Sequence, residues 1–495
     1  MSVILINKIN HSFIRITCER SIKAELQDYF SFFVPGYKFQ PKYKYGLWDG
    51  KIRLFDLRTN TLPAGLVNDL YTFAKERNYI LKIDKDSIPF KIFDEKYDLD
   101  IPLCLDNKEI ALRDYQENAI NYAIKHRRCI IVSPTASGKS LNLYTLFRYF
   151  KDDKFLLIVP TQSLVEQMYS DFKEYSTLDS SFEVNESTIH RIYSGHDKKN
   201  KTARLFISTW QSIYKLPQSW FAEFTAVIAD EAHLCKAQCL TKIMNSCVNA
   251  HIRVGTTGTL SNNSRVNEMV LKGLFGPVYK ATTTKELIDN DTLSKTQIHV
   301  FHIKYNKDII TTFRKTTNKD YPSEMAYITQ IDERNKLIAK LVSAQKKNTL
   351  VLFNYVQSHG KPLFELVKSS IDRPVYYISG EVDAKERERL RYTLEQESNS
   401  VLIASIGTFS TGVNVRNLHN IIFASPTKSQ IRVLQSLGRG LRKHGEKSLL
   451  TVYDIVDDFT GNRYKKNFAL LHGIERIKIY TKEKFEFNLH EFKVL

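Results

Sequence analysis

IIVSPTASGKS, residues 130–140, joins a short apolar run to Gly138-Lys139-Ser140, the end of a phosphate-binding loop. Residues 128–132 are predicted to form a strand, and the apolar spacing of residues 141–150 predicts a helix. A tight turn of free backbone N–H groups, followed by the positive N-terminal end of a helix, is suited to phosphate. A strand, loop and helix of this kind are typical of an α/β fold with a parallel sheet.

The loop has the residue types that a nucleotide site requires. Gly138 supplies unusual dihedral angles, Lys139 a mobile cation for the β- and γ-phosphates, and Ser140 a hydroxyl for Mg²⁺. Ser133 stands where such loops usually have glycine, but it is small enough for close backbone approach. The candidate nucleotide-binding residues of the loop are Ser133, Pro134, Thr135, Ala136, Ser137, Gly138, Lys139 and Ser140. A lysine-bearing turn before an ordinary helix is the alternative, so a second site has to decide.

Two adjacent carboxylates follow a second apolar run. Residues 225–229 are predicted to form a buried strand, and Asp230 and Glu231 stand at its carboxyl end. One carboxylate there can hold Mg²⁺ through water, and the other can orient and deprotonate an attacking water. We assign Asp230 to the metal and Glu231 to the general base. Carboxylates that merely cap the next helix are the alternative, but combined with the loop they indicate nucleotide hydrolysis.

The chain of 495 residues is too long for a single core. Apolar strand-like runs alternate with helical patterns twice, which predicts two similar parallel-sheet domains. The acidic, proline-punctuated stretch 84–103 reads as a linker after a smaller N-terminal region. The predicted domains are residues 1–85, 86–285 and 286–495.

Lysine and arginine exceed aspartate and glutamate by 72 − 54 = 18, which favours a nucleic-acid partner, although surplus lysine can also serve solubility. The six cysteines include no Cys-x-x-Cys pair, as expected of a reduced, intracellular chain. No run is long enough to span a membrane, and no signal peptide is predicted. One cluster has a spacing that matches no usual zinc pattern: His233, Cys235, Cys239, Cys247 and His251.

Three stretches resemble motifs I, II and VI of the superfamily 2 helicases and translocases: GKS, DEAH (230–233) and QSLGRGLRK (435–443). The remaining motifs of that superfamily follow in order: VPTQSLVEQ (159–167) resembles Ia, STWQS (208–212) Ib, GTTGTL (255–260) III, LVLFNYVQSHG (350–360) IV and IGTFSTGVNVRNL (406–418) V. RDYQ (113–116) resembles the glutamine element that contacts adenine. Asn414, Ser436 and Thr257-Gly258-Thr259 depart from the usual residues of motifs V, VI and III.

Within this superfamily the whole chain resembles the recombination and repair helicases of T4-like phages. The resemblance lies in YGLWDGKIRLF (45–55), FSTGVNVRNLH (409–419), GRGLRKHG (438–445) and LLHGIERI (470–477). It implies two tandem RecA-like parallel-sheet domains behind a small N-terminal α/β domain. It also implies DNA-dependent ATP hydrolysis that unwinds or branch-migrates forks, Holliday junctions and R-loops. A cytoplasmic place in the host cell, and a monomer or weak oligomer, are expected.

The resemblance assigns further site residues. Arg113, Gln116 and Gly412 are expected at the nucleotide, and Gln435, Arg439 and Arg442 in catalysis. Because Arg439 and Arg442 are three apart, they would share one face of a helix. Arginines delivered from the second domain can stabilise the charge developing on the γ-phosphate, an effect of about 10³–10⁵ in rate.

Two sets of residues are candidates for contacts with DNA. Motifs Ia, Ib and V offer polar groups for the phosphates, which are contacted without regard to sequence. In YKFQPKYKYGLWDGKIRLF (37–55), cations interleave with aromatic side chains that could stack on exposed bases. The candidates are Thr161, Thr209, Gln211 and Thr411 in the motifs, and Lys42, Lys44, Trp48, Lys51 and Arg53 in the N-terminal region. The alternative for the latter is a strand with aromatic residues in the core and lysines in water.

The motor motifs do not separate DNA from RNA, so an RNA-directed helicase is a second hypothesis. The motor part of a restriction system is a third, although no Pro-Asp dipeptide of a common nuclease site occurs. A non-catalytic annealing protein is disfavoured by the intact hydrolytic residues.

Overall fold

The computed structural model describes residues 2–83, 92–98, 100–235, 237–258, 265–318, 320–412, 415, 417–427, 429–442, 447–461 and 466–494. The chain forms two compact units. The first comprises Met1–Ser133 with Gly138–Thr282, and the second Thr283–Leu495 with Pro134–Ser137. Each is an α/β structure, and the predicted fold class is confirmed.

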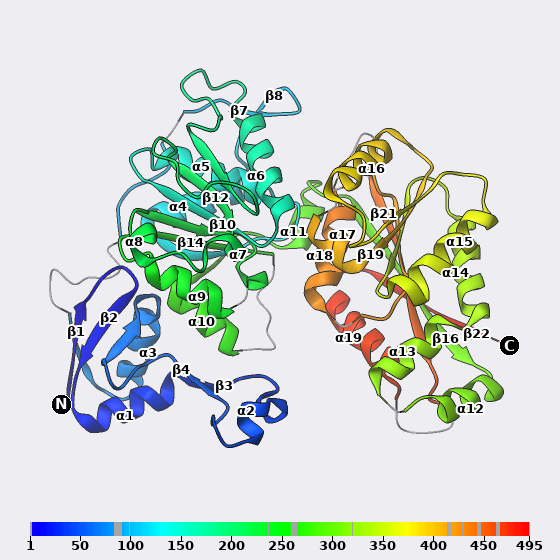
Figure 1. Ribbon diagram of the computed structural model, residues 1–495, viewed down its shortest axis with the longest axis horizontal. Helices are drawn as coiled ribbons and strands as arrows, with labels where there is room; N and C mark the ends of the chain where they lie inside the picture. The colour runs from blue at the N-terminus through cyan, green and yellow to red at the C-terminus, as the bar shows by residue number, and fades with distance from the viewer. Residues whose placement is uncertain are drawn as a thin grey trace. The chain divides into compact units, whose positions relative to one another are not determined.

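The first unit begins with a four-stranded sheet in the order β5-β2-β1-β6. Its strands are β1 (Val3–Lys8), β2 (Phe13–Thr17), β5 (Thr61–Pro63) and β6 (Ile80–Ile83). Helices α1 (Arg20–Tyr29) and α3 (Val67–Glu76) bury apolar residues against it, including Leu26 and Phe73 (Figure 1). This sheet therefore has a core of its own.

The segment rich in lysine and aromatic residues leaves that core as a small lobe, residues 31–53. It contains β3 (Ser31–Phe33), a 3-10 turn (Tyr37–Phe39), α2 (Pro41–Lys44) and β4 (Lys51–Arg53), which pairs antiparallel with β3. The alternative of a strand across 37–55 is wrong, because Tyr37–Phe39 and Pro41–Lys44 are helical and Gly46 and Gly50 adopt left-handed conformations that break the extended chain.

The first unit continues with a seven-stranded parallel sheet, called here the first sheet. Its strand order is β11-β12-β10-β13-β14-β9-β15. Its strands are β9 (Arg128–Val132), β10 (Phe155–Val159), β11 (Ile189–Ile192), β12 (Leu205–Thr209), β13 (Ala226–Ala229), β14 (Ile252–Thr257) and β15 (Val278–Lys280). A short hairpin, β7 (Leu103–Leu105) with β8 (Lys108–Ile110), precedes it.

Helices cover both faces of this sheet, each over its own apolar cluster (Figure 1). One face carries α4 (Asp114–His126), α5 (Lys139–Tyr149) and α6 (Gln162–Tyr175). The other carries α7 (Trp210–Ile213), α8 (Gln218–Phe221), α9 (Ala237–Ser246) and α10 (Arg265–Phe275). Burial on both faces explains why the central strands are near-continuous apolar runs.

Buried polar contacts join the N-terminal sheet to this larger sheet within the unit. The guanidinium of Arg253 donates to Ser12 Oγ at 2.7 Å, and that of Arg128 donates to the carbonyl of His11 at 2.9 Å. Gly65 lies so close to α10 that a Cβ there would be 1.9 Å from the carbonyl oxygen of Lys272. Hydrogen bonds from two arginines and close backbone packing at Gly65 thus hold the N-terminal sheet against the larger sheet.

The second unit contains another seven-stranded parallel sheet, in the order β18-β19-β17-β20-β21-β16-β22. Its strands are β16 (Lys295–Tyr305), β17 (Thr349–Phe353), β18 (Val375–Ile378), β19 (Val401–Ser405), β20 (Asn420–Phe423), β21 (Leu449–Asp458) and β22 (Phe487–Val494). Its helices are α11 (Thr284–Asp289), α12 (Lys307–Thr316), α13 (Tyr321–Thr329), α14 (Asp332–Ala344), α15 (Lys361–Ser370), α16 (Ala384–Gln396), α17 (Ile406–Gly412), α18 (Gln430–Gly440) and α19 (Phe468–Lys482). Among the described residues, no helix combines the length and apolar character that a membrane crossing requires.

Candidate nucleotide and nucleic-acid sites

The predicted phosphate loop connects β9 to α5 in the first sheet. Two of its residues, Ala136 and Gly138, have left-handed φ angles of 69° and 81°. A Cβ at Gly138 would lie 2.5 Å from the side-chain nitrogen of Gln116, so both conformation and space require glycine there. The backbone therefore turns sharply just before the N-terminal end of α5.

Lys139 lies beside the predicted carboxylates. Its ammonium donates to the carbonyl oxygen of Ser133 at 3.2 Å and is 3.5 Å from the Glu231 carboxylate. Ser133 is buried, so the residue in the usual glycine position is accommodated and its carbonyl helps to hold the lysine. The structure thus brings together two motifs that are more than 90 residues apart in the sequence.

Asp230 and Glu231 follow β13, which lies between β10 and β14 in the sheet. Asp230 is buried and accepts a hydrogen bond from Thr256 Oγ1 on β14. Burial, and then the neighbouring Glu231, raise the pKa of Asp230 above its usual value, while Lys139 acts in the opposite direction. The backbone N–H of Gly258 donates to Glu231 at 3.5 Å. Thr256 was not predicted as a site residue, although the motif III resemblance at 255–260 contains it.

Gln116 is tied to the phosphate loop at the start of α4. Its side-chain oxygen accepts from the backbone N–H of Arg113 at 3.0 Å, and its nitrogen donates to the Gly138 carbonyl at 3.4 Å. The Arg113 side chain reaches the Tyr115 hydroxyl. The structure therefore places the predicted adenine element beside the loop. Ser140, the predicted metal ligand, has its hydroxyl 2.8 Å from that of Tyr175 on α6.

The candidate DNA residues of motifs Ia and Ib lie together at the carboxyl edge of the first sheet. Val159 at the end of β10 pairs in register with Thr209 at the end of β12. Thr161 caps α6 by accepting from the Leu164 N–H, and Thr209 bonds to Ser212 at 2.8 Å. Gln211 donates to the Pro160 carbonyl at 3.3 Å, which joins the two motifs.

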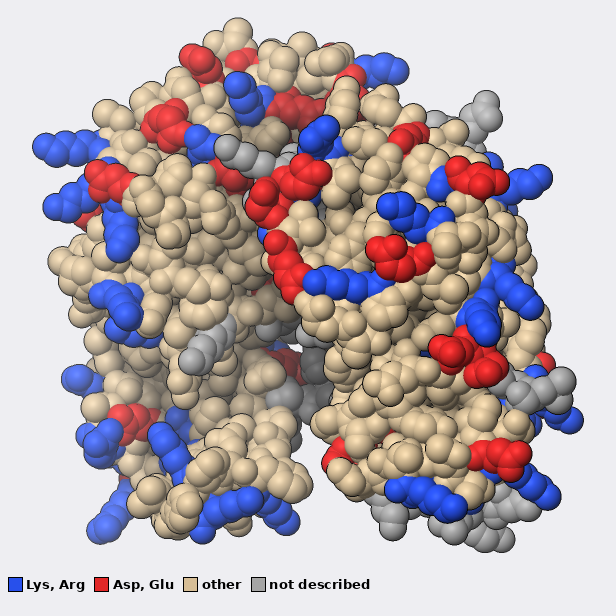
Figure 2. All heavy atoms as spheres, turned by 45° about the vertical axis from the view of Figure 1, so that its right-hand side comes forward, with Lys and Arg blue, Asp and Glu red and all other residues tan. Residues whose placement is uncertain are grey.

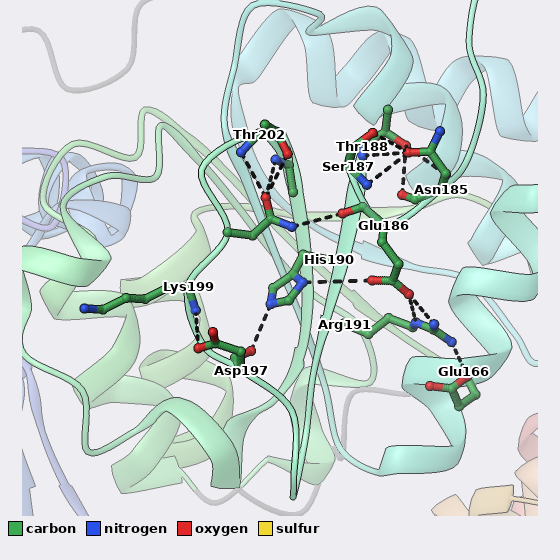
Figure 3. Close-up of polar contacts among 12 residues, drawn as sticks. Glu166, Asn185, Glu186, Ser187, Thr188, His190, Arg191, Asp197, Lys199 and Thr202 are labelled. Atoms are coloured by element: carbon green, nitrogen blue, oxygen red, sulfur yellow. Dashed lines mark hydrogen bonds and ion pairs between the residues drawn. The ribbon is translucent and has the colours of Figure 1, made fainter.

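A polar network at the edge strand β11 holds α6 from the side (Figure 3). Arg191 donates to Glu166 of α6 at 2.6 Å and also pairs with Glu186. His190 donates to the main-chain oxygen of Asp197 at 2.9 Å, which fastens the loop that follows the strand. Helix α6, which follows the Thr161 cap, is thus held to β11 near its N-terminal end.

Motif VI occupies α18 and the residues just after it in the second unit. Gln435 is buried in α18, and Arg439 lies 5.9 Å from the ring of Phe409 on α17. The expectation that Arg439 and Arg442 share one helical face is wrong, because α18 ends at Gly440 and Arg442 forms a β-bridge with Leu293. Thr411 and Gly412 end α17, and nothing of their side chains is described. Asn414, noted for motif V, lies outside the described residues.

The small lobe places its cations and some of its aromatic residues in water. Phe39, Tyr45 and Leu47 are 81%, 78% and 77% exposed. Lys42 and Lys44 are exposed on α2, and Figure 2 shows many Lys and Arg side chains at the lower left, the part formed by the N-terminal residues.

Other residues of the lobe have internal contacts. Tyr37 stacks on Phe33 with 4.7 Å between ring centroids, and Lys51 lies over the Phe33 ring. Trp48 is partly buried and donates from its indole to the Lys51 carbonyl at 2.8 Å, while Arg53 pairs with Asp49. Phe39 and Tyr45, which belong to the aromatic residues predicted to stack on bases, are therefore the most exposed rings of the lobe, whereas the candidate Trp48 is partly buried.

The cysteine cluster does not form a metal centre in the part of the chain that the structure describes. No group of three or more histidine, cysteine, aspartate or glutamate side chains there is arranged to hold a metal ion. Burial raises the pKa of the Cys235 and Cys247 thiols to about 12. These two cysteines pack in the apolar cluster under α9.

Comparisons with known proteins agree with this arrangement. Residues 4–84 match the family described as "DNA helicase UvsW, N-terminal", residues 109–262 "Type III restriction enzyme, res subunit", and residues 332–444 "Helicase conserved C-terminal domain". The family matches thus include one in the N-terminal region and one in each parallel-sheet unit.

Similar proteins span nearly the whole chain. The "ATP-dependent DNA helicase uvsW" of Enterobacteria phage T4 is 37% identical, over 96% of this chain and 97% of its own length. The crystal structure of T4 UvsW is 34% identical and matches with a TM-score of 0.51, covering 99% of this chain and 100% of its own. The "DNA 3'-5' translocase XPB2" of Sulfurisphaera tokodaii is 24% identical, over 74% of this chain and 83% of its own.

Proposed function

The chain belongs to the UvsW family of superfamily 2 helicases, and on this basis we propose that it unwinds or branch-migrates forks, four-way junctions and R-loops in phage recombination and repair. It is an ATP-dependent DNA helicase. The observation that carries the proposal is the meeting of Lys139, Asp230 and Glu231 at the carboxyl edge of the first sheet. We place this activity in the cytoplasm of the infected host.

Lys139, Glu231 and Gln116 have distinct tasks in hydrolysis. Lys139 neutralises charge on the β- and γ-phosphates, which the N-terminal end of α5 also attracts. Glu231 orients the attacking water and takes its proton, and its distance of 3.5 Å from Lys139 puts it beside the phosphate position. Gln116 holds the loop through the Gly138 carbonyl and faces the adenine.

The residues present fit Mg²⁺. Asp230 and Ser140 offer the hard oxygen ligands that this ion prefers. The raised pKa of the buried Asp230 shows that its charged form is costly in the protein alone, and a nearby cation would stabilise that form. When bound, Mg²⁺ neutralises charge on the phosphate oxygens. Arg439 and Arg442 are proposed to stabilise the additional charge that develops during cleavage.

DNA contact is proposed at two places. Thr161, Thr209 and Gln211 hold phosphates at the edge of the first sheet, with Thr411 and motif V assisting from the second unit. In the lobe, Lys42 and Lys44 contact phosphates, while Phe39 and Tyr45 stack on bases exposed at a branch point. Exposed aromatic rings among cations suit single-stranded nucleic acid better than a plain duplex.

ATP-dependent processing of a labelled panel tests the proposal: a fork, a four-way junction, an R-loop, a plain duplex and an RNA duplex of the same sequence. We expect turnover to be stimulated by DNA and product to form from the branched substrates first. Stronger stimulation by RNA would favour the RNA-directed helicase. Translocation on plain duplex without strand separation would favour the restriction-type motor.

A matched pair of variants tests the lobe. Phe39→Ala with Tyr45→Ala should weaken fork binding by about 1–3 kcal/mol for each lost stacked base. Tyr71→Ala with Tyr392→Ala removes two exposed rings elsewhere and should leave binding unchanged. Equal effects of the two pairs would contradict the role of the lobe.

A further inference from the structure

The C-terminal end of α18 is held by a buried lysine. An α-helix leaves its last carbonyl groups without partners inside the helix, and buried carbonyls need donors from elsewhere. Lys447, only 4% exposed, donates from its ammonium to the carbonyl oxygens of both Gly440 and Arg442, the latter at 3.0 Å. A cation at this position also complements the negative end of the helix dipole.

The segment that enters the second unit holds the carbonyl that lies between these two. The backbone N–H of Ser294 donates to the Leu441 carbonyl at 2.9 Å, and Leu293 forms an antiparallel bridge with Arg442. Leu293, Ser294 and Leu441 are all buried. The backbone around Arg442 is therefore fixed by three consecutive carbonyl contacts, at residues 440, 441 and 442.

Capping α18 with a buried lysine costs free energy of folding. Burial lowers the pKa of Lys447 to about 7, which reflects the free energy needed to remove its charge from water. The hydrogen bonds from the Lys447 ammonium to the carbonyls of Gly440 and Arg442 hold the chain where it leaves the helix, between Arg439 and Arg442.

We propose that Lys447 is a positioning residue for ATP hydrolysis, which sets the placement of Arg442 relative to Arg439 through the carbonyls at the end of α18. This rests on the proposed function of the two arginines in stabilising the developing charge. A misplacement of about 1 Å at a catalytic group can cost about 10²-fold in rate, so a cap that fixes the backbone has a kinetic effect.

The test compares three variants. Lys447→Met keeps the length of the side chain and removes its donor, whereas Lys447→Gln keeps an N–H donor. Lys478→Met on α19 is the exposed control. At saturating DNA, kcat for ATP should fall roughly tenfold or more in Lys447→Met, with KM for ATP little changed. Lys447→Gln should recover part of the loss, and Lys478→Met should match the wild type. Should Lys447→Met not fold, Lys447→Gln against the wild type gives the same comparison of kcat.

A double-mutant cycle with Arg442→Ala separates this inference from the proposed function. If Lys447 acts through Arg442, Lys447→Met should add little to the kcat loss already caused by Arg442→Ala. A normal kcat in Arg442→Ala would instead show that the role of the arginine is wrong. A large loss in Arg442→Ala together with a normal kcat in folded Lys447→Met would overturn the positioning role.

Discussion

Asp454 and Asp457 in the second unit and Asp230 in the first are buried carboxylates with different partners. In the second unit, Arg334 donates twice to Asp457, at 2.7 and 3.0 Å, and neither side chain is exposed. Arg476 is paired in the same manner with Asp454, and the Tyr480 hydroxyl donates to that carboxylate. Burial alone would lower the pKa of Arg334, but the Asp457 carboxylate raises it above its usual value, as expected of a close ion pair.

In the first unit, the buried carboxylate of Asp230 is supported less completely than those of Asp454 and Asp457. Asp230 accepts from the neutral hydroxyl of Thr256 and adjoins a second carboxylate, which contributes to its raised pKa. The same fold thus contains charge that is compensated internally and charge that a ligand would stabilise. We infer that the partners around a buried carboxylate, rather than burial alone, distinguish Asp230 from the guanidinium-paired Asp454 and Asp457.

The largest effect is expected from Lys139→Ala. This substitution should abolish ATP turnover and unwinding, because no other group of the loop carries the cation for the phosphates. DNA binding and the melting temperature should change little. Filter binding, ATPase assays and a thermal melt of the same preparation check this, and robust hydrolysis would show that the loop has another role.

Glu231→Gln should slow hydrolysis by roughly 10²–10⁴-fold, the usual contribution of a general base. The amide keeps the size of the side chain, so nucleotide and DNA affinity should persist. Single-turnover kinetics at saturating ATP provide the measurement. Hydrolysis near the wild-type rate would mean that another residue activates the water.

Arg476→Met probes the other side of the comparison. It leaves Asp454 buried without its guanidinium and should destabilise the second unit by about 3–5 kcal/mol. Lys478→Ala, which breaks an exposed pair with Glu475 on the same helix, should cost no more than about 1 kcal/mol. Urea unfolding of both variants checks the contrast, and equal losses would refute it.

Charge reversal in the lobe should leave folding and basal ATPase intact. The triple change Lys42→Glu, Lys44→Glu and Lys51→Glu should weaken fork binding. The slope of log binding constant against log salt concentration should become shallower by about 0.9 for each lost phosphate contact. The triple change Lys336→Glu, Lys340→Glu and Lys346→Glu alters net charge equally on exposed residues of the second unit. The assignment fails if both triples shift the salt dependence alike.

The last effect concerns pH. Above pH 7 the folded state has released the Lys447 proton, whereas the unfolded chain keeps it up to its usual pKa of 10.5. Unfolding then takes up a proton, so between pH 7 and 10 the stability of the wild type should rise relative to Lys447→Met. The slope is at most about 1.4 kcal/mol per pH unit. Urea titrations of both proteins at several pH values measure the difference, and a flat difference would contradict it.

Sequence patterns predicted the central strands well because these are buried on both faces and therefore apolar throughout. β11, β16 and β22 were not predicted, because polar residues such as His190, Arg191 and Lys304 interrupt their apolar runs. The lobe was considered as a strand, and it is broken into short pieces at left-handed glycines. Arg442 was expected on a helix because spacing alone does not show where a helix ends.

The residues predicted for the nucleotide site could be read from the sequence, because a glycine, a lysine and adjacent carboxylates at strand ends are chemical requirements that local pattern preserves. The groups that support these residues became visible in the packed fold. Thr256 holds Asp230, Lys447 caps α18, and buried Arg128 and Arg253 join the N-terminal sheet to the first motor sheet. These contacts link residues far apart in the chain, and their energies depend on burial, which only the packed structure establishes.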